Sequence, residues 1–396
     1  MLKRMLVLLL ALVMVAGMVP CASAEEEFRI GISVSFTGPN AQNGLEAING
    51  LKMALEEINA AGGFNGEQGV LATLYDSKGS TEEAVKTAMK LTQNEDVDAV
   101  IASQVSAEVL AAGQYYEDAQ IFTIGMGTSA SWMKKGWKYL IRGSVNYDFV
   151  APEVVSMIFD MGINQIAVMK DQSEAALSFA ATFTKLCEEK GIEILLEESC
   201  EPDDTDLSAQ CARIVGAKPQ AIFLSMTSND CGYFVKQVRQ SGYTGLIFDK
   251  ESFFASMVNI AGPENSNYIL FANPYVTYAD LEDCTIENMK AFLTKYLELY
   301  GALPTTEIAY RAYDSAMVIW EATKISGSNE TEAMLAAVPQ IKIEGLGGTM
   351  DYTNGDGEPY HAVRRFIYLD GLNQDWGAWM ESGGYEAYKA ETGNAY

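Results

Sequence analysis

The sequence predicts an α/β fold made of two doubly wound lobes. Its 396 residues suffice for about two domains of roughly 150 residues each. With 48% apolar and 20% charged residues, the composition is that of a globular protein. Short β-branched runs alternate with longer stretches of helical periodicity, in two series along the chain. Because strands that alternate with helices predict parallel sheets covered on both faces, two series predict two lobes.

The first series contains four expected strands, at 28–36, 70–75, 99–103 and 121–125. A helix follows the first strand, because apolar residues recur there at helical spacing: Leu45, Ile48, Leu51, Leu55 and Ile58. Gly62-Gly63 ends this helix, and Ser80 with Glu83 forms a capping box that opens the next one. The apolar face expected for that second helix consists of Val85, Ala88 and Met89.

The second series contains five expected strands, at 166–169, 192–196, 221–226, 245–248 and 268–272. Helices are then expected at 285–300, 306–326 and 332–338. A hairpin is expected over 348–370, with its turn at Asn354-Gly355-Asp356-Gly357. No low-complexity linker separates the two series, which indicates that the lobes share the chain by repeated crossing.

The N-terminus predicts a secretory signal peptide over residues 1–24. Its basic, apolar and cleavage regions are Lys3-Arg4, Met5–Val19 and Ala22-Ser23-Ala24. No later run approaches the roughly 18 apolar residues of a membrane span. We therefore expect an extracytoplasmic protein, in the periplasm or at the cell surface. The alternative is a lipid anchor at Cys21, which we do not expect because Met18-Val19-Pro20 offers no small residue before the cysteine.

Charge and histidine content exclude several functions. With 53 acidic against 27 basic residues, the formal charge of −26 would repel nucleic acid. A single histidine, His361, cannot build a multi-histidine zinc site, and any Ser-His-Asp mechanism would need it. It lies on the outgoing arm of the expected hairpin, so we expect a hydrogen-bonded or solvent-facing side chain. We expect no catalytic residue and no enzyme.

Signals for cofactors and metals are weak. The segment Gly125–Ala130 fits a relaxed dinucleotide fingerprint after a strand, but it stands alone in an exported chain. The turn at 354–357 faintly resembles a calcium loop, yet Tyr352 and Val363 occupy the positions where carboxylates are needed. We expect no cofactor and no metal.

Five cysteines follow the predicted signal peptide. Cys200 and Cys211 form the natural local pair for a disulfide. The alternative is that the cysteines are small buried hydrophobes, which the helical apolar pattern around Cys187 favours.

In the first series, the residues that follow the strands are the candidate ligand contacts. Ligands of open parallel sheets bind beyond the carboxyl ends of the strands, where helix N-termini present unpaired N–H groups. Ser106 follows one strand, and Gly127, Thr128 and Ser129 follow the next. Such hydroxyl-bearing helix starts can hold a carboxylate. The alternative is that Ser106 and Ser129 only cap helices.

In the second series, Thr227 and Glu251 follow strands in the same way. Glu251 could pair with a ligand ammonium, or it could complement a helix dipole from the first turn. Aromatic side chains at strand ends or crossings either contact ligand or pack in the core; they are Phe36, Trp132, Tyr147 and Tyr275. Of these, Phe36 and Tyr147 are included in the expected site.

Several segments occur in a familiar order. They are Ile30-Gly31-Ile32, Thr37–Gly44, Glu57–Gly66, Tyr75-Asp76-Ser77, Gly127-Thr128-Ser129, Arg142, Asn146-Tyr147-Asp148 and Ala309–Asp314. On these segments the chain resembles the type I extracytoplasmic solute-binding proteins of ABC transporters, specifically the branched-chain amino-acid (Leu/Ile/Val) binding family. The resemblance covers nearly the whole mature length.

The resemblance implies two Rossmann-like lobes that are joined by three hinge crossovers and close on a small ligand. It places lobe I at 28–145 plus 273–346 and lobe II at 146–272 plus 347–396. The residues that match the family's ligand carboxylate and amino contacts are Ser106, Gly127 and Ser129, and Glu251 matches the acid that takes the ligand ammonium. The chain departs from the family at Asn43, Thr227 and Ser173-Glu174-Ala175, where aromatic residues or a Tyr-Gly pair are common.

The expected function is that of an extracytoplasmic solute-binding component of an ABC uptake transporter. The expected ligand is a small amino-acid-like solute, since the departures in the pocket do not favour leucine specifically. The expected partner is the transporter permease, and we expect a monomer. The alternatives are a ligand-sensing subunit of a membrane receptor and an exported enzyme.

Overall fold

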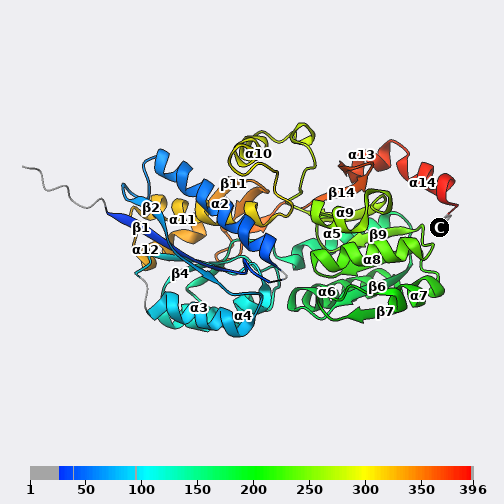
Figure 1. Ribbon diagram of the computed structural model, residues 1–396, viewed down its shortest axis with the longest axis horizontal. Coiled ribbons are helices and arrows are strands. Elements are labelled where there is room, and N and C mark those ends of the chain that lie inside the picture. Colours follow the sequence, from blue (N-terminus) through cyan, green and yellow to red (C-terminus); the bar gives the residue numbers. More distant parts are fainter. Residues whose placement is uncertain (1–25, 39, 94–95, 394–396) are drawn as a thin grey trace, which may run out of the picture.

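The computed structural model describes residues 26–38, 40–93 and 96–393, which form two lobes side by side (Figure 1). The predicted signal peptide and Cys21 lie outside this range. Within it, no helix is long and apolar enough to cross a membrane.

Lobe I is built on a parallel sheet of strand order β2-β1-β3-β4-β5. Its strands are β1 Glu27–Val34, β2 Gln68–Asp76, β3 Ala99–Ala102, β4 Phe122–Gly125 and β5 Leu140–Arg142. The helices around this sheet are α2 Ala41–Ala60, α3 Thr81–Gln93, α4 Ser106–Ala119, α11 Ile308–Ser326 and α12 Thr331–Ala337. Alternate residues of β3 face opposite sides: Ile101 packs in a core with α2 and α11, and Val100 in a core with α3 and α4.

Lobe II is built on a seven-stranded sheet of order β15-β14-β10-β9-β8-β6-β7. Its strands are β6 Gln165–Asp171, β7 Glu193–Cys200, β8 Ala221–Ser225, β9 Leu246–Asp249, β10 Ile269–Asn273, β14 Arg364–Leu369 and β15 Leu372–Asp375. Its helices are α5 Tyr147–Asp160, α6 Glu174–Lys190, α7 Ser208–Ala217, α8 Ser228–Gln240, α9 Ala255–Ala261, α13 Trp376–Glu381 and α14 Gly384–Thr392. The β14 and β15 strands are antiparallel to their neighbours, whereas the other five strands run parallel.

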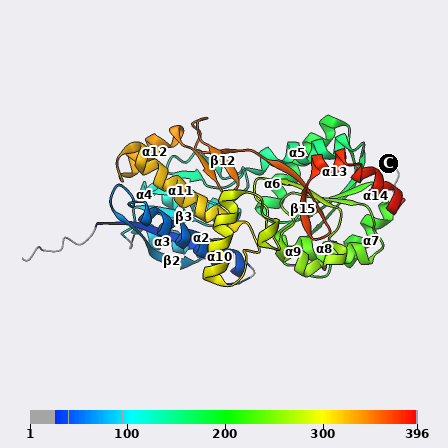
Figure 2. The same cartoon turned by 90° about the horizontal axis from the view of Figure 1, so that it is seen from above.

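The remaining elements connect or decorate the lobes. They are α10 Glu287–Tyr300, the strands β11 Lys342–Gly345, β12 Gly348–Asp351 and β13 Tyr360–His361, and the 3₁₀ turns Met133–Lys135, Pro263–Asn265, Leu281–Asp283 and Val338–Gln340. The chain crosses between the lobes after β5, after β10 and after β13. Figure 2 shows the last crossing as the orange-red segment that leads from β12 toward β15.

The third crossing between the lobes lies later in the chain than the boundary expected between residues 346 and 347. Met350 and Tyr352 are buried in the same core as α2 and α11, and β13 pairs with β12. Residues 347–361 therefore lie with lobe I, and the crossing falls at 362–363. The expected hairpin over 348–370 is wrong in its outgoing arm for the same reason: β14 pairs with β10 and β15. Alternating apolar residues define the faces of a strand but do not select its partner.

Two helical residues expected on buried faces are exposed. Leu45 is 47% exposed and Met89 is 37% exposed. The buried stripe of α3 consists of Ala84, Thr87, Ala88 and Leu91. The predicted capping box is present in part, since the N–H of Glu83 donates to Oγ of Ser80 at 3.4 Å.

Of the two interpretations of the cysteines, the structure has the free, buried one, and the disulfide between Cys200 and Cys211 is not formed. Within the described residues the cysteines are free and buried: Cys187, Cys200, Cys211, Cys231 and Cys284. Cys200 and Cys211 pack with apolar side chains of lobe II, as the alternative interpretation proposes.

The expectation for His361 is also wrong. Its side chain is fully buried, and among the described residues neither ring nitrogen has a hydrogen-bond partner. Burial lowers the pKa of His361 to about 3, and the positive charges of Arg311 and Arg142 act in the same direction. The imidazole is therefore neutral at physiological pH.

Candidate functional site

A cavity of about 380 Å³, called the ligand cavity below, lies between the two lobes. Its lobe I lining is Asn40, Gln42, Asn43, Gly79, Gln104, Val105, Ser106, Ala107, Thr128, Thr306, Glu307, Ile308 and Arg311. Its lobe II lining is Gln172, Ser173, Glu174, Ala175, Pro202, Asp203, Thr227, Asn229, Lys250, Glu251, Phe254 and Ser256. The helices α4, α6, α8 and α11 all begin at this lining. Their N-terminal N–H groups contribute a positive potential close to each helix start, which favours an anion there.

The start of α4 and the loop after β4 form the hydroxyl wall, consisting of Ser106 and Thr128. Oγ of Ser106 accepts hydrogen bonds from the N–H groups of Thr128 and Ser129, each at 3.1 Å. A Cβ added at Gly127 would lie 2.9 Å from Cα of Ser106, so the loop packs tightly on the helix start. Because the Ser106 oxygen accepts two backbone N–H groups, its own proton is available to an acceptor in the cavity.

A buried arginine supports the hydroxyl wall from behind. The guanidinium of Arg142 donates to the carbonyl of Gly127, and to the carbonyl of Ser129 at 2.6 Å. Its Nε donates to Glu358 at 2.5 Å, and its guanidinium lies 4.3 Å from the centroid of the Trp132 ring. These contacts hold the loop after β4 in one conformation.

The end of β9 forms the ionic wall, consisting of Lys250 and Glu251. Nζ of Lys250 lies 2.8 Å from Oε1 of Glu251, and the hydroxyl of Tyr147 donates to Oε2 at 2.5 Å. All three side chains are buried. Burial disfavours the charged carboxylate, but Lys250, the Tyr147 hydroxyl and Arg311 together hold the pKa of Glu251 below its ordinary value. Burial likewise opposes the charge of Lys250, but Glu251, Cys231 and Asp249 together more than offset this and raise the lysine pKa.

Helix α11 contributes a second buried ion pair. Arg311 and Glu307 are four residues apart on this helix and contact each other. Glu307 also accepts from Nδ2 of Asn273 at 3.1 Å, and Arg311 donates to the carbonyl of Met126 at 3.4 Å. The four buried charges of the ligand cavity therefore form two pairs.

Apart from Oε1 of Glu307, which contacts Arg311, three buried polar atoms of cavity-lining residues have no hydrogen-bond partner among the described residues: Oε1 of Gln104, Oγ of Ser256 and Nε of Arg311. Buried polar groups are rarely left unpaired, because the lost hydration costs about 1–3 kcal/mol. A bound solute is the natural source of the missing partners.

Only some of the predicted ligand contacts line the ligand cavity. Ser106, Thr128, Thr227 and Glu251 line the ligand cavity. The others lie outside the lining. Gly127 packs behind the hydroxyl wall, the Ser129 hydroxyl donates to Ser131 and Glu174, and Tyr147 packs behind the ionic wall. Phe36 packs against the lobe I core.

Sequence reasoning missed the main charged residues of the site, Lys250, Glu307 and Arg311. A signal existed for Arg311, which stands as a lone charge between the apolar residues Tyr310 and Ala312. The positions where the chain departs from its family do line the ligand cavity, namely Asn43, Thr227, Ser173, Glu174 and Ala175.

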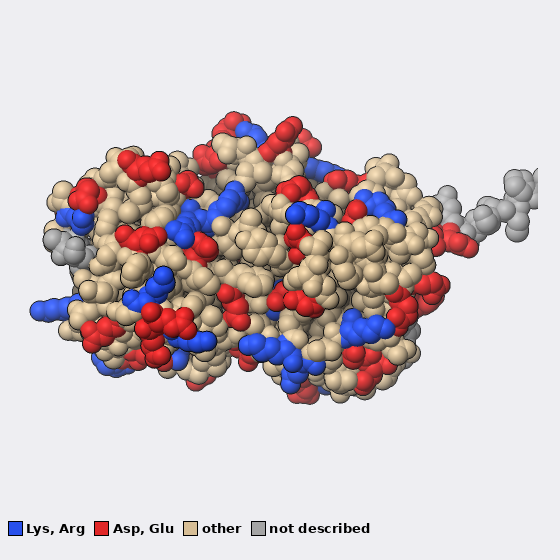
Figure 3. All heavy atoms as spheres, turned by 180° about the vertical axis from the view of Figure 1, so that it is seen from behind, with Lys and Arg blue, Asp and Glu red and all other residues tan. Residues whose placement is uncertain are grey.

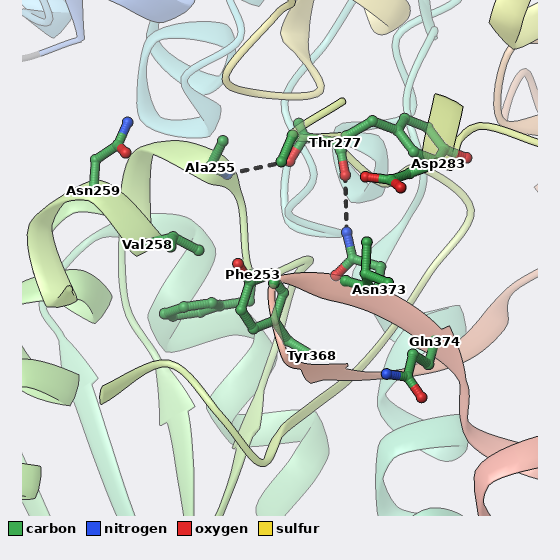
Figure 4. Close-up of a pocket in the computed structure, with 13 residues that line it drawn as sticks. Phe253, Ala255, Val258, Asn259, Thr277, Asp283, Tyr368, Asn373 and Gln374 are labelled. Carbon is green, nitrogen blue, oxygen red and sulfur yellow. Dashed lines mark hydrogen bonds between the residues drawn. The ribbon is translucent and has the colours of Figure 1, made fainter. Parts of the chain in front are cut away.

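Two other cavities each involve one lobe or a crossing segment. One of about 490 Å³ lies among α2, α10, α11 and β11. The other, of about 220 Å³, lies between α9, the segment after β10 and the β14–β15 pair (Figure 4). In the second cavity Thr277 accepts from Ala255 through Oγ1 at 3.2 Å and from Asn373 through its carbonyl at 2.8 Å. The larger of the two is lined by charges of both signs, but its cations, Lys295 and Lys324, are exposed rather than buried.

The surface carries no large area of one charge on the face that Figure 3 shows, where acidic and basic side chains are interspersed over both lobes. Among the described residues, no group of three or more His, Cys, Asp or Glu side chains is arranged to hold a metal ion.

Comparisons with known proteins give a consistent result. A family model described as periplasmic binding protein matches residues 27–368. The leucine-, isoleucine-, valine-, threonine- and alanine-binding protein of Pseudomonas aeruginosa is 24% identical over 346 residues, which cover 87% of this chain and 90% of that protein.

Solved structures share the fold. The branched-chain amino-acid transporter substrate-binding protein LivJ of Streptococcus pneumoniae, in complex with isoleucine, has a TM-score of 0.78 and 24% identity, covering 88% of this chain and 98% of that chain. An ABC transporter solute-binding protein of Rhodopseudomonas palustris, in complex with 3,4-dihydroxybenzoic acid, has a TM-score of 0.78 and 20% identity, covering 88% of this chain and 96% of that chain.

Proposed function

The chain belongs to the periplasmic binding protein family, and from this premise we propose that it captures a small amino-acid-like solute for an ABC uptake transporter. As a solute-binding protein it acts outside the cytoplasm. We propose that it works there as a monomer and passes its solute to the transporter permease. The two similar structures hold isoleucine and dihydroxybenzoic acid, so the fold alone does not specify the ligand.

The observation that carries the proposal is the ligand cavity between the lobes. It combines helix N-termini, paired buried charges and three buried polar atoms that have no partner among the described residues. A solute that contacts both lobes stabilises the closed arrangement by the contacts that it makes only there.

We propose that the solute carboxylate binds at the hydroxyl wall. The Ser106 hydroxyl supplies its free proton, and the α4 N-terminus supplies a favourable potential. Ser129, Gly127 and Arg142 position these groups from behind. Phe254 and Ile308 offer apolar surface for the rest of the solute.

A thermal-shift screen tests the proposal. The panel contains the twenty amino acids, their 2-oxo and 2-hydroxy analogues, amides and aromatic acids. A ligand at 100 times its dissociation constant stabilises the folded protein by about 2.7 kcal/mol. The proposal predicts a concentration-dependent shift for at least one carboxylate of the panel and no conversion of that compound. Failure of every carboxylate to shift the melting temperature would refute the proposal, and detectable turnover would favour the enzyme alternative.

A further inference from the structure

The acid expected to receive a ligand ammonium is already engaged. Oε1 of Glu251 lies 2.8 Å from the Lys250 ammonium, and Oε2 accepts from the Tyr147 hydroxyl at 2.5 Å. Lys250 is 3% exposed, and Glu251 is 8% exposed. The lysine belongs to the same strand end as the acid, so the protein itself supplies the cation at this position.

The two cations of the ligand cavity, Lys250 and Arg311, retain N–H groups that can donate hydrogen bonds to a ligand. An ammonium has three N–H donors, and Glu251 is the carboxylate that Lys250 contacts. The Lys250 nitrogen also lies 5.2 Å from the centroid of the Tyr147 ring, which offers no lone pair. Nε of Arg311 is buried and has no hydrogen-bond partner among the described residues. Both side chains line the cavity.

A ligand ammonium placed at Glu251 would also face Lys250 at short range. In a water-poor cavity the repulsion between two such cations is of the same order as the attraction to the acid, so the ion pair offers little net attraction. An uncharged oxygen at the same position meets no such repulsion and accepts an N–H from Lys250.

We propose that the solute carries a hydrogen-bond acceptor rather than an ammonium beside its carboxylate, so that the site selects 2-oxo or 2-hydroxy acids over α-amino acids. The inference rests on the proposed function, since it specifies the solute of the same site. The carboxylate lies at the hydroxyl wall, and the 2-oxygen faces Lys250.

Matched pairs of solutes test the inference by calorimetry at pH 7. The pairs are leucine with 4-methyl-2-oxopentanoate, valine with 3-methyl-2-oxobutanoate and phenylalanine with phenylpyruvate, each with its 2-hydroxy analogue. We expect the oxo or hydroxy acid of the best pair to bind at least tenfold more tightly than the amino acid. Equal or tighter binding of the amino acid would overturn this inference and leave the proposed function intact. Binding of neither class would overturn this inference, whereas the proposed function fails only if no carboxylate of the thermal-shift panel binds.

Variants of the lysine give a second measurement. Lys250→Met releases Glu251, so the ratio of oxo-acid to amino-acid affinity should fall at least tenfold, whereas Lys250→Arg should retain the preference. Lys236→Met removes an exposed lysine on α8 and should leave the ratio unchanged. An unchanged ratio in a folded Lys250→Met protein would overturn the inference, and if that variant does not fold, the wild-type ratio still decides.

Discussion

Lobe I faces the solute with the neutral hydroxyl wall and with the buried Glu307–Arg311 pair of α11, whereas lobe II faces it with the ionic wall of Lys250 and Glu251. Neutral hydroxyl groups can be hydrated when the cavity is open, at little cost. Buried charges must be paired whether or not a ligand is present, because an unpaired buried ion costs several kcal/mol. The difference indicates a division of roles: the hydroxyl wall provides general affinity for carboxylates, and the ionic wall discriminates among their substituents.

The supports of the two walls differ as well. The hydroxyl wall depends on backbone groups held by Arg142, whose partners at Gly127 and Ser129 lie within 15 residues in sequence. The ionic wall depends on Tyr147, which is 104 residues from Glu251. Mutations should therefore affect the two walls to different degrees.

The largest expected effect is on the ionic wall. Glu251→Ala leaves the Lys250 charge buried without its partner, and we expect a loss of about 3–5 kcal/mol in the free energy of unfolding, measured by chemical denaturation. Glu189→Ala is the control, because Glu189 lies 3.9 Å from Lys185 in an exposed pair that contributes at most about 1 kcal/mol. Equal losses in both variants would contradict the role assigned to the ionic wall.

A smaller effect is expected at the hydroxyl wall. Ser106→Ala removes the donor to the solute and the acceptor of two buried N–H groups, so affinity should weaken by about 1–3 kcal/mol in calorimetry. Ser129→Ala should weaken it less, because the Ser129 hydroxyl already donates to Ser131 and Glu174. Ser208→Ala, at the first residue of α7, serves as the control and should have no effect. A larger loss of affinity for Ser129→Ala than for Ser106→Ala would show that Ser129, rather than Ser106, contacts the solute carboxylate.

The pH dependence of stability should report on Asp249, the last residue of β9, which directly precedes the ionic wall. Burial, followed by the charge of Glu251, raises the pKa of Asp249 to about 8, from 3.8. The folded state then holds a proton that the unfolded state loses between about pH 4 and 8, so Asp249 makes the free energy of unfolding fall as pH rises through this window.

Asp249→Asn should flatten that fall by at most about 1.4 kcal/mol per pH unit, measured by denaturation from pH 5 to 8. Asp118→Asn, an exposed carboxylate of lobe I, is the control. An unchanged pH dependence in Asp249→Asn would show that Asp249 is ionised in the folded state.

The smallest expected effect is that of a reductant. Lobe II holds four of the described cysteines, and all are free: Cys187, Cys200, Cys211 and Cys231. A thiol reductant should therefore leave the melting temperature unchanged in differential scanning calorimetry. A lowered melting temperature would reveal a bridge in lobe II, with Cys200→Ser as the variant that locates it.

Sequence periodicity was sufficient for most of the fold. The nine strands expected in the two series coincide with β1 to β4 and β6 to β10, because each buried strand carries a continuous or alternating apolar run. The short strands β5, β11 and β15 were missed, since three or four residues carry too little pattern. The partner of β14 was wrong because pairing depends on distant parts of the chain.

For the site, the sequence alone located the helix starts that line the cavity, since position after a strand is a local property. Ser106, Thr128, Thr227 and Glu251 were found in this way. It did not distinguish Ser129 from Ser106, because which hydroxyl faces the cavity depends on packing against Arg142 and Gly127.

What the sequence by itself determined is the family, the α/β architecture and the order of strands and helices, because these follow from local patterns. Only the tertiary structure decided the third crossing and the partners of Glu251. A carboxylate at a strand end has the same local sequence whether it waits for a ligand ammonium or pairs with Lys250 and Tyr147. Its electrostatic environment is set by side chains that only the folded chain brings together.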